Sequence, residues 1–397
     1  NLDLKMKGKM DQLTKETVQL TKALVKIPSE NPTGNEFLVG KYLEYFLKKN
    51  NIPYEKSLVE TKRENLTIEI GNRKNKSLAF INHTDTVPVG EGWNTDPFSA
   101  KISKGKLFGR GSCDMKGGIA SSLIALKEIK KKIDAGKKIK KFLKYILVVD
   151  EESAWMKGVS HEINSGKITK EDLVISCEPT SLNLVIAQKG AMWYEIEIKG
   201  KNAHAASPHM GVNAIHASCL VIESLYEEFR KKKLVNPLLG KTTFVPSIIQ
   251  GGRKTNMVAD QCKFQIDVRF IPPLTIKRIE NLIKKTVSKS CRKFPGTKGF
   301  VKSICIDRPP IISNQKSNGC ILIRDVIEKN LGIKTQTLGV SYYSDSGVVA
   351  SSTKNKQCFL LGPGNIEQAH SPNEFVNLKE LNKATKIYLD IMEKYLS

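Results

Sequence analysis

The sequence lacks two features that would define its class at once: long apolar runs and paired cysteines. No apolar run approaches the ~20 residues that a membrane-spanning helix requires, so we expect no association with a membrane. The eight cysteines are scattered without a Cys-x-x-Cys pair, which disfavours both a disulfide framework and a cysteine-ligated zinc site. Free thiols are typical of a reducing compartment, so we predict a cytoplasmic protein.

Acidic residues are scarce relative to basic ones. The chain has 40 Asp and Glu against 64 Lys and Arg, which gives a formal net charge of +24. Such a charge raises the question of nucleic-acid binding. The basic residues are mostly lysines spread along the chain, however, and no motif typical of DNA or RNA recognition is present. We therefore interpret the charge as a solvated, lysine-rich surface, with attraction of an anionic substrate or an acidic partner as the alternative.

The chain is long enough for two domains, with 397 residues of which 40% are hydrophobic. In its first half, short apolar runs typical of buried strands alternate with stretches typical of helices. The predicted strands are 66–70, 78–82, 145–149 and 173–176, and the predicted helices are 35–49 and 117–132. This order predicts an α/β fold with a mixed sheet flanked by helices.

The pattern changes near Gly190, where apolar and polar residues begin to alternate as in a strand with one wet face. From there we expect strands at 192–198, 242–250, 264–270 and 300–306, and helices at 212–233 and 276–290. The order strand-helix-strand-strand-helix-strand is that of a ferredoxin-like α+β unit. We therefore predict one domain formed by residues 1–190 and 308–397, with residues 191–307 inserted as a second domain.

Acidic and histidine side chains follow the ends of several predicted strands. Open α/β sheets bind ligands beyond the carboxyl ends of their strands, so we expect these groups to surround one crevice. They are His83, Asp85, Glu151, Glu152, Glu178 and His370, together with Asp114 in a glycine-rich turn before a predicted helix. Each motif alone is typical of a surface turn, and only their combination at strand ends predicts a site.

Imidazoles and carboxylates without a thiolate are donors suited to one or two divalent ions such as zinc, cobalt or manganese. Carboxylates placed so closely would otherwise repel one another and take up protons. Two such ions can share one water molecule and lower its pKa to about 7. In the pair Glu151–Glu152, neighbouring side chains point in different directions. One of them can therefore bind metal while the other acts as a general base.

The motifs that contain these residues resemble those of the dinuclear zinc peptidase and deacylase family. They are Asn82-His-Thr-Asp-Thr-Val-Pro88, Trp93 with Asp96-Pro-Phe98, Gly105-Lys-Leu-Phe-Gly-Arg-Gly-Ser-Cys-Asp-Met-Lys-Gly-Gly118, Asp150-Glu-Glu152, Cys177-Glu-Pro-Thr180, Gly200-Lys-Asn-Ala-His-Ala-Ala-Ser-Pro208 and Gly362-Pro-Gly-Asn-Ile-Glu-Gln-Ala-His370. The family includes acetylornithine deacetylase, succinyl-diaminopimelate desuccinylase, aminoacylase and glutamate carboxypeptidase. The similarity extends from about residue 15 to about residue 390, and the last motif is most similar to the acetylornithine deacetylase branch.

The resemblance implies a role for each of the clustered residues. His83, Asp114 and Glu178 would bind one metal ion, and Asp114, Glu152 and His370 the other, so that Asp114 bridges the two. Glu151 would act as the general base. Asp85 would orient His83, as carboxylates beside metal-bound imidazoles do. The peptide bond between Asp114 and Met115 would be cis.

The resemblance also implies residues that contact the substrate. His204, in the inserted domain, would stabilise the oxyanion, commonly in the active site of the partner subunit; from the residues alone it could equally cap a helix. Asn256, Arg269 and the turn at Gly362 and Gly364 would bind the carboxylate of the substrate, although a solvated Arg269 on the polar face of its strand would be ordinary.

These observations predict a two-domain metallohydrolase with two divalent ions, zinc being expected and cobalt or manganese being the alternatives. Its expected substrate is an N-acyl amino acid, whose amide bond metal-activated water would cleave, as in acetylornithine deacetylase or succinyl-diaminopimelate desuccinylase. A dipeptidase or metallo-carboxypeptidase of the same family is the alternative. The inserted domain would serve as a lid and as the dimerisation domain of a homodimer.

Overall fold

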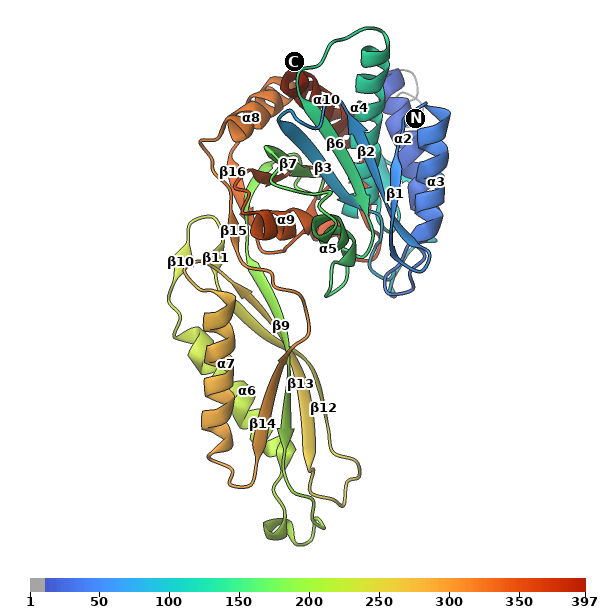
Figure 1. Ribbon diagram of the computed structural model, residues 1–397. Helices are drawn as coiled ribbons and strands as arrows, with labels where there is room; N and C mark the ends of the chain where they lie inside the picture. Colours follow the sequence, from blue (N-terminus) through green and yellow to red (C-terminus); the bar gives the residue numbers. More distant parts are fainter. Residues whose placement is uncertain (1–10) are drawn as a thin grey trace. The chain divides into compact units, whose positions relative to one another are not determined.

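The computed structural model describes residues 11–397, which divide into two compact units (Figure 1). The first unit comprises the residues up to Ile186 together with Ile312–Leu338 and Ser344–Ser397, and the second comprises Ala187–Ile311 and Gly339–Tyr343. The second unit is therefore slightly larger than the predicted insertion at 191–307. Its short additional segment is tied to it by a backbone hydrogen bond of 3.1 Å from Lys189 N to Val340 O.

A mixed sheet, nine-stranded among the described residues, forms the centre of the first unit. Its order is β1-β2-β6-β3-β7-β17-β8-β15, with β16 paired to β8. Neighbouring strands among β6, β3, β7 and β17 are parallel, whereas β1 with β2 and β2 with β6 are antiparallel. The strands are β1 (Glu55–Glu60), β2 (Arg63–Ile70), β3 (Ser77–His83), β6 (Phe142–Val148), β7 (Leu173–Ser176), β8 (Leu184–Gln188), β15 (Ile311–Ile312), β16 (Thr337–Val340) and β17 (Cys358–Leu360). The predicted mixed α/β class is confirmed.

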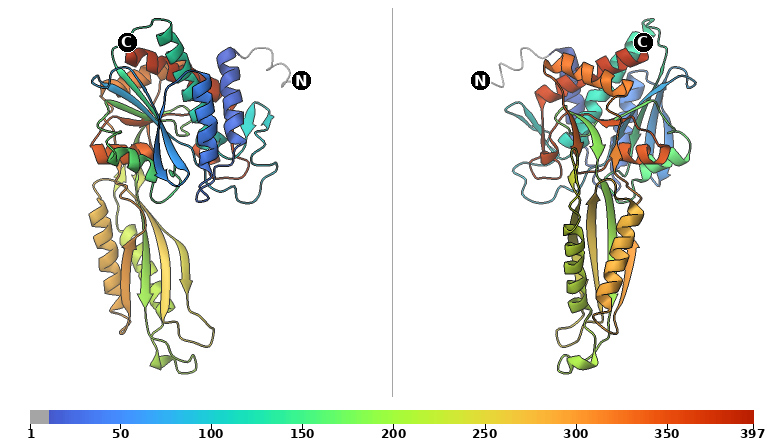
Figure 2. Two further views of the ribbon diagram at one scale, coloured as in Figure 1. Left: turned by 45° about the vertical axis from the view of Figure 1, so that its right-hand side comes forward. Right: turned by 90° about the vertical axis from the view of Figure 1, so that its left-hand side faces the viewer.

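Helices cover both faces of this sheet, which explains why the central strands are continuous apolar runs. Figure 2 (left) shows α2, α3 and α4 on one side and α5 and α9 on the other. The helices are α2 (Gln12–Val25), α3 (Glu36–Lys49), α4 (Gly117–Asp134), α5 (Lys157–Asn164), α8 (Asn318–Leu331), α9 (Asp345–Thr353) and α10 (Leu378–Leu396). Across residues 11–397, no helix is long and apolar enough to cross a bilayer.

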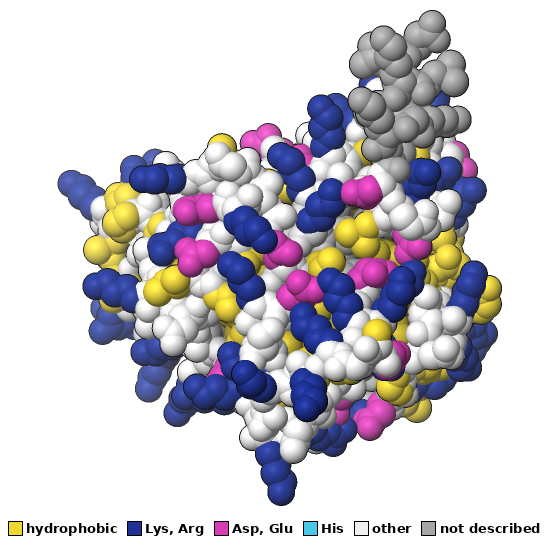
Figure 3. Space-filling view, turned by 90° about the horizontal axis from the view of Figure 1, so that it is seen from above, with side chains coloured by type: hydrophobic (Ala, Val, Ile, Leu, Met, Phe, Trp, Pro, Cys, Tyr) yellow, Lys and Arg dark blue, Asp and Glu magenta, His cyan; other side chains and the backbone are white. Residues whose placement is uncertain are grey.

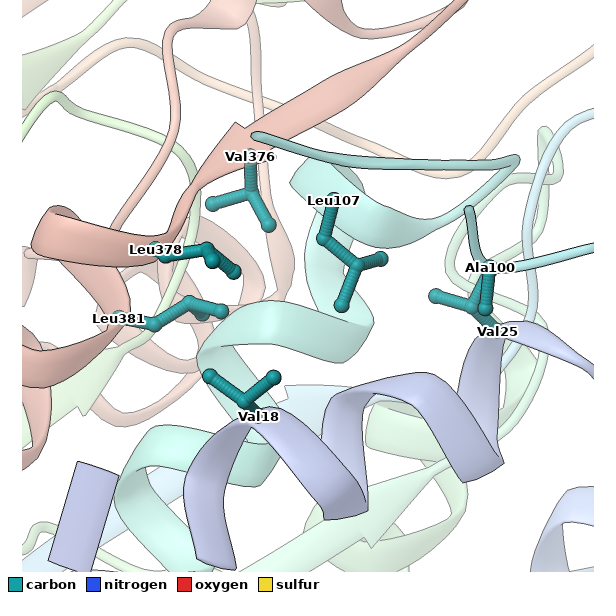
Figure 4. Packing of buried hydrophobic residues seen from close by; sticks show 7 residues of the cluster. All are labelled: Val18, Val25, Ala100, Leu107, Val376, Leu378 and Leu381. Carbon is teal, nitrogen blue, oxygen red and sulfur yellow. The ribbon is translucent and has the colours of Figure 1, made fainter. Parts of the chain in front are cut away.

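A small antiparallel sheet in the order β18-β5-β4 lies beside the main one. Its strands are β4 (Ile102–Ser103), β5 (Lys106–Phe108) and β18 (Phe375–Asn377). A buried apolar cluster packs between this sheet, α2 and α10 (Figure 4) and consists of Val18, Val25, Ala100, Leu107, Val376, Leu378 and Leu381. Because β5 precedes Asp114 in the chain and β18 follows His370, this packing fixes two segments of the predicted site relative to each other.

The second unit has the predicted strand-helix-strand-strand-helix-strand order. The elements are β9 (Gly190–Lys199), α6 (Ala214–Arg230), β12 (Thr243–Gly251), β13 (Gln261–Phe270), α7 (Ile276–Cys291) and β14 (Lys298–Ser303), with a hairpin of β10 (Val235–Asn236) and β11 (Gly240–Lys241) and the short helix η2 (Pro208–Met210) in the loops. The sheet is antiparallel in the order β12-β13-β9-β14. Along β9 and β13, buried side chains alternate with partly exposed ones, as their sequence pattern predicted.

Charged side chains are mixed on the face of the molecule seen in Figure 3. Lys and Arg side chains are scattered over this face, and Asp and Glu side chains lie between them. Such mixing agrees with the interpretation of the basic surplus as a solvated surface.

Gly118, at the second position of α4, allows the helix to approach the segment after β7. A Cβ atom built on Gly118 would lie 2.3 Å from the carbonyl oxygen of Cys177. We expect Gly118→Ala to lower the free energy of unfolding by about 1–3 kcal/mol, the usual cost of overpacking. Gly40, inside α3, has nothing within 4 Å of its added Cβ. Gly40→Ala should therefore stabilise by about 0.5–1 kcal/mol. Urea unfolding of both variants measures the contrast, and equal stabilities would contradict it.

Candidate metal centre

The parallel strands bring four chain segments to one edge of the sheet. β3 ends at His83, and Glu151 and Glu152 follow β6. Glu178 follows β7, and His370 lies after β17 and the short helix η3 (Ile366–Gln368). Because the carboxyl ends of parallel strands meet at the same edge, these side chains converge there although they are far apart in the sequence.

The convergent side chains form two overlapping groups in which all the offered N and O atoms lie within 4.8 Å of one another. One group is His83, Asp114 and Glu178, and the other is Asp114, Glu152 and His370. His83 Nε2 lies 3.2 Å from Asp114 Oδ1, and His370 Nε2 lies 3.5 Å from Asp114 Oδ2. Asp114 therefore faces the two groups with different oxygens. The structure brings together the same two triads that the resemblance implied, and a further group combines His83, Glu151 and Glu152.

Asp114 reaches this position from a short helical segment, η1 (Ser112–Lys116), that precedes α4. The Asp114–Met115 peptide bond is cis, as predicted. Asp114 has extended backbone angles, with φ −121° and ψ 99°, and with Met115 it interrupts the helical conformation of this segment. Its side chain is buried among the imidazoles of the site, with a relative exposure of 9%.

Asp85 supports the site through the backbone of the two glutamates. Its side-chain oxygens accept hydrogen bonds from the amide groups of Glu151 and Glu152, at 3.1 and 3.0 Å. The predicted contact with His83 is made by the main chain: His83 Nδ1 lies 3.0 Å from Asp85 O and 3.7 Å from Asp85 Oδ1. The Asp85 carboxylate instead accepts hydrogen bonds from the turn after β6. Asp85 therefore positions the glutamate pair as well as His83.

Two further side chains from distant segments support this turn, and sequence reasoning missed both. Asn31 Nδ2 donates to Asp85 Oδ2 at 2.8 Å and to Asp150 Oδ1 at 3.1 Å. Arg63 Nη2 donates to the same Asp150 oxygen at 2.9 Å and also pairs with the buried Glu36. No local motif marks Asn31 or Arg63, since their partners lie far away in the chain.

Burial dominates the electrostatics of the carboxylates. Desolvation raises the pKa of Glu151 and of Glu152, and neighbouring carboxylates add to the effect. Desolvation likewise raises the pKa of Glu178. Burying several carboxylates side by side is unfavourable unless protons or cations balance their charge. The site therefore has the electrostatic character of a cation-binding centre.

The pKa values of the two histidines are raised as well, but by their carboxylate partners and against the effect of burial. Burial alone would lower the pKa of His83, but hydrogen bonds to Asp114 and Glu178 raise it well above its usual value. Hydrogen bonds to Asp114 and Glu152 raise the pKa of His370 to about 10. In turn, these imidazoles outweigh the desolvation of Asp114 and hold its pKa below the usual range. Without a metal ion, these shifts favour the protonated form of both imidazoles.

Asp345 is a further acidic residue of this region that sequence reasoning did not single out. It begins α9, is 1% exposed, and within residues 11–397 neither of its carboxylate oxygens has a hydrogen-bond partner. Desolvation raises its pKa well above the usual value, and the charges of Glu178 and Asp85 raise it further.

The predicted substrate residues of the second unit lie in two separate places. His204 forms a β-bridge with Met257, and Ala205 N donates to Asn256 O at 3.0 Å, so His204 and Asn256 are neighbours. Arg269 lies towards the other end of β13, where Nε is 2.8 Å from Asp267 Oδ1. At ~3.3 Å per residue, β13 spans roughly 25 Å from Gln261 to Arg269, and Asn256 precedes the strand. One chain therefore does not gather these three residues around one ligand.

The turn at Gly362 and Gly364 uses its amide groups within the chain. Gly362 N donates to Thr180 Oγ1 at 3.1 Å, and Gly364 N donates to Glu380 Oε2 at 2.7 Å. A Cβ atom on Gly362 would lie 2.4 Å from the carbonyl oxygen of Glu178. Both amide groups are thus engaged within the chain, and binding of the substrate's carboxylate by this turn stays a prediction. Gly362 allows the chain to pass closely beside Glu178.

Comparisons with known proteins agree with this geometry. The chain is 30% identical over 389 residues to acetylornithine deacetylase of Buchnera aphidicola subsp. Schizaphis graminum, covering 95% of this chain and 97% of that protein. It is 31% identical over 395 residues to acetylornithine deacetylase of Photorhabdus laumondii, covering 95% and 97%. Its fold is similar to that of an M20 family metallo-carboxypeptidase from Sulfolobus solfataricus, with a TM-score of 0.80 and 19% identity, covering 97% of this chain and 99% of that one.

The fold and the site together define a hydrolase of the metallopeptidase type. Residues 79–394 match peptidase family M20/M25/M40. The chain belongs to this family, which is the one that the sequence motifs resembled.

Zinc binding should displace protons from the two imidazoles. A histidine must be neutral to bind a metal ion, so zinc added to the metal-free protein at pH 7 should release about two protons. Apparent affinity should rise with pH, because the pKa values of both histidines are raised and zinc competes with their protons. Calorimetry in two buffers of different ionisation enthalpy measures the release. His370→Ala should release fewer protons, while His209→Ala, an exposed histidine in the second unit, should match the wild type. Binding without proton release would contradict the geometry.

Proposed function

We propose that the protein is a dinuclear metal-dependent amidohydrolase. The observation that supports this most directly is the pair of triads that share Asp114. In the proposal, His83 and Glu178 complete one metal site, and Glu152 and His370 complete the other. The imidazole and carboxylate donors fit zinc, with cobalt or manganese as alternatives. Two such ions would supply an activated water by lowering its pKa.

Glu151 is the proposed general base. It is half-buried, it adjoins the proposed ligand Glu152, and its amide group donates to Asp85. Desolvation raises the pKa of its carboxyl group well above the usual value, and a raised carboxyl pKa favours a group that accepts and later returns a proton. Glu151 would therefore take a proton from the attacking water and deliver it to the leaving amine.

The proposed substrate is an N-acyl amino acid of the kind named by the acetylornithine deacetylases, which match 95% of this chain at about 30% identity. The eight cysteines are free thiols, which suits the proposed cytoplasmic location. A panel of N-acetyl and N-succinyl amino acids against dipeptides, each with added zinc or cobalt, tests the substrate class. Faster hydrolysis of the acyl-amino acids is expected, and a clear preference for dipeptides would establish the peptidase alternative instead.

Glu151→Gln should separate metal binding from catalysis. The variant keeps the size of the side chain but cannot accept a proton, so we expect both metal ions to remain and the rate to fall by ~10²–10⁴. Glu223→Gln, a substitution of the same kind on the exposed surface of α6, should keep full activity. Metal analysis and kcat are measured on the same samples. Loss of metal with activity would make Glu151 a ligand rather than the base.

The proposed homodimer forms through the sheet of the second unit. β12 is an edge strand, and Val245, Ile248 and Ile249 are 52%, 48% and 52% exposed on it. An exposed apolar edge strand can pair with another strand. In a dimer with a two-fold axis, the same edge strand of the second copy would cover β12 of the first, and the reverse.

His204 is proposed to stabilise the oxyanion in the active site of the partner subunit. Its Nδ1 accepts a hydrogen bond of 3.1 Å from Ala206 N. The neutral imidazole therefore has its proton on Nε2, where it can be donated to a developing negative charge.

Subunit mixing tests the dimer and the role of His204 together. His204→Ala and Glu151→Gln homodimers should both be nearly inactive, each for its own reason. Mixed dimers would contain one site with both residues intact, so co-expression should restore about one quarter of wild-type activity. Size-exclusion chromatography with light scattering checks that a dimer is present. Activity no higher than that of the separate variants would contradict action across the dimer.

A further inference from the structure

A buried ion pair between Arg110 and Glu374 lies beside the backbone of Asp114. None of the roles described so far involves this pair. Arg110 and Glu374 are 1% and 0% exposed, and Arg110 Nη1 lies 2.6 Å from Glu374 Oε2. Arg110 lies within the glycine-rich motif at 105–118, whereas Glu374 follows the last motif, and neither belongs to the groups that could hold a metal ion. A charge pair removed from water so completely requires close hydrogen bonding around it.

The second oxygen of Glu374 holds the backbone that presents Asp114. Glu374 Oε1 accepts hydrogen bonds from Cys113 N at 2.8 Å and from Asp114 N at 3.1 Å. Two amide groups on one carboxylate oxygen fix the path of the main chain at the residue that both triads share. The direction of the Asp114 side chain therefore depends on Glu374.

Arg110 extends the same connection to the segments of the two histidines. Its Nη2 donates to Pro88 O and Val89 O, both at 3.1 Å, in the segment that follows His83 and Asp85. Its Nη1 lies 3.4 Å from Ser371 O, directly after His370. A planar guanidinium with several fixed donors can join these groups, whereas a single ammonium cannot.

We propose that Arg110 and Glu374 are positioning residues that set the geometry of both metal sites. The inference rests on the proposed function, since it assumes that the two triads bind metal ions. One ion pair connects the segments of three ligands: His83, Asp114 and His370. β5 and β18, which flank the pair in sequence, are themselves fixed by the apolar cluster of Figure 4. Residues around the ligands commonly set metal affinity by orienting them.

The alternative is that the pair stabilises the fold without affecting the metal sites, and the chain offers a matched control. Lys144 and Glu171 form another buried ion pair in the same unit, 6% and 4% exposed, with Nζ 2.9 Å from Oε1. Lys144 lies near the start of β6 and Glu171 just before β7, at the edge of the sheet away from the metal centre. Loss of charge there should affect stability without reaching the ligands.

Zinc titration of full-length, metal-free protein distinguishes a positioning role of the Arg110–Glu374 pair from a role in fold stability alone. Competition with a chromophoric chelator gives the zinc affinity, and circular dichroism with thermal unfolding confirms that each variant is folded at the titration temperature. We expect Glu374→Gln to bind zinc ~10–100-fold more weakly than the wild type at both steps, because both triads include Asp114. Glu171→Gln should bind zinc with wild-type affinity, although its thermal stability is also reduced.

Arg110→Lys keeps the charge beside Glu374 and decides the question should Glu374→Gln fail to fold. It should fold and weaken zinc binding, because the ammonium cannot retain the contacts to Pro88 and Val89. Wild-type zinc affinity in a folded Glu374→Gln or Arg110→Lys would overturn the inference, as would an equal loss in Glu171→Gln. Absence of zinc binding by the wild type would instead refute the proposed function, and the inference with it.

Discussion

Repulsion between buried carboxylates is the constraint on which the site depends. Asp114, Glu151, Glu152 and Glu178 are gathered at one sheet edge, and desolvation raises the pKa of the three glutamates. Without metal, the protein compensates with protonated imidazoles, which pair with Asp114 from both sides. Divalent cations would replace those protons and satisfy the same oxygens. The charge of the site would then be balanced in either of two forms, one with protonated imidazoles and one with bound cations.

The fold meets this constraint by distributing the ligands over several strands and then connecting their loops. Parallel pairing of β6, β3, β7 and β17 places the strand ends together. Hydrogen bonds of Asp85 to Glu151 and Glu152, and of Glu374 to the backbone of Asp114, then fix the loops. The paired strands set the distances between the candidate ligands. The buried hydrogen bonds set the directions of the ligand side chains.

The sequence predicted those parts of the structure that local patterns encode. Apolar runs located the central strands, and the His-x-Asp and Asp-Glu-Glu motifs located the side chains at their ends. Its failures share one physical cause, since Asn31, Arg63 and Arg110 act through partners far away in the chain. Gly362 shows the same limit: the close packing of its turn against Glu178 was not evident from its motif, while its predicted substrate contact stays a prediction. The separation of Asn256 from Arg269 likewise followed only from the length of β13.

The stoichiometry of bound zinc tests the central claim most directly. Purified protein is loaded with zinc and freed of excess metal by gel filtration. Its zinc content is then measured by mass spectrometry and divided by the protein concentration. The account predicts two ions per chain in the wild type and loss of both in Asp114→Asn, because one side chain serves both sites. One ion per chain, or two ions retained without the Asp114 carboxylate, would contradict it.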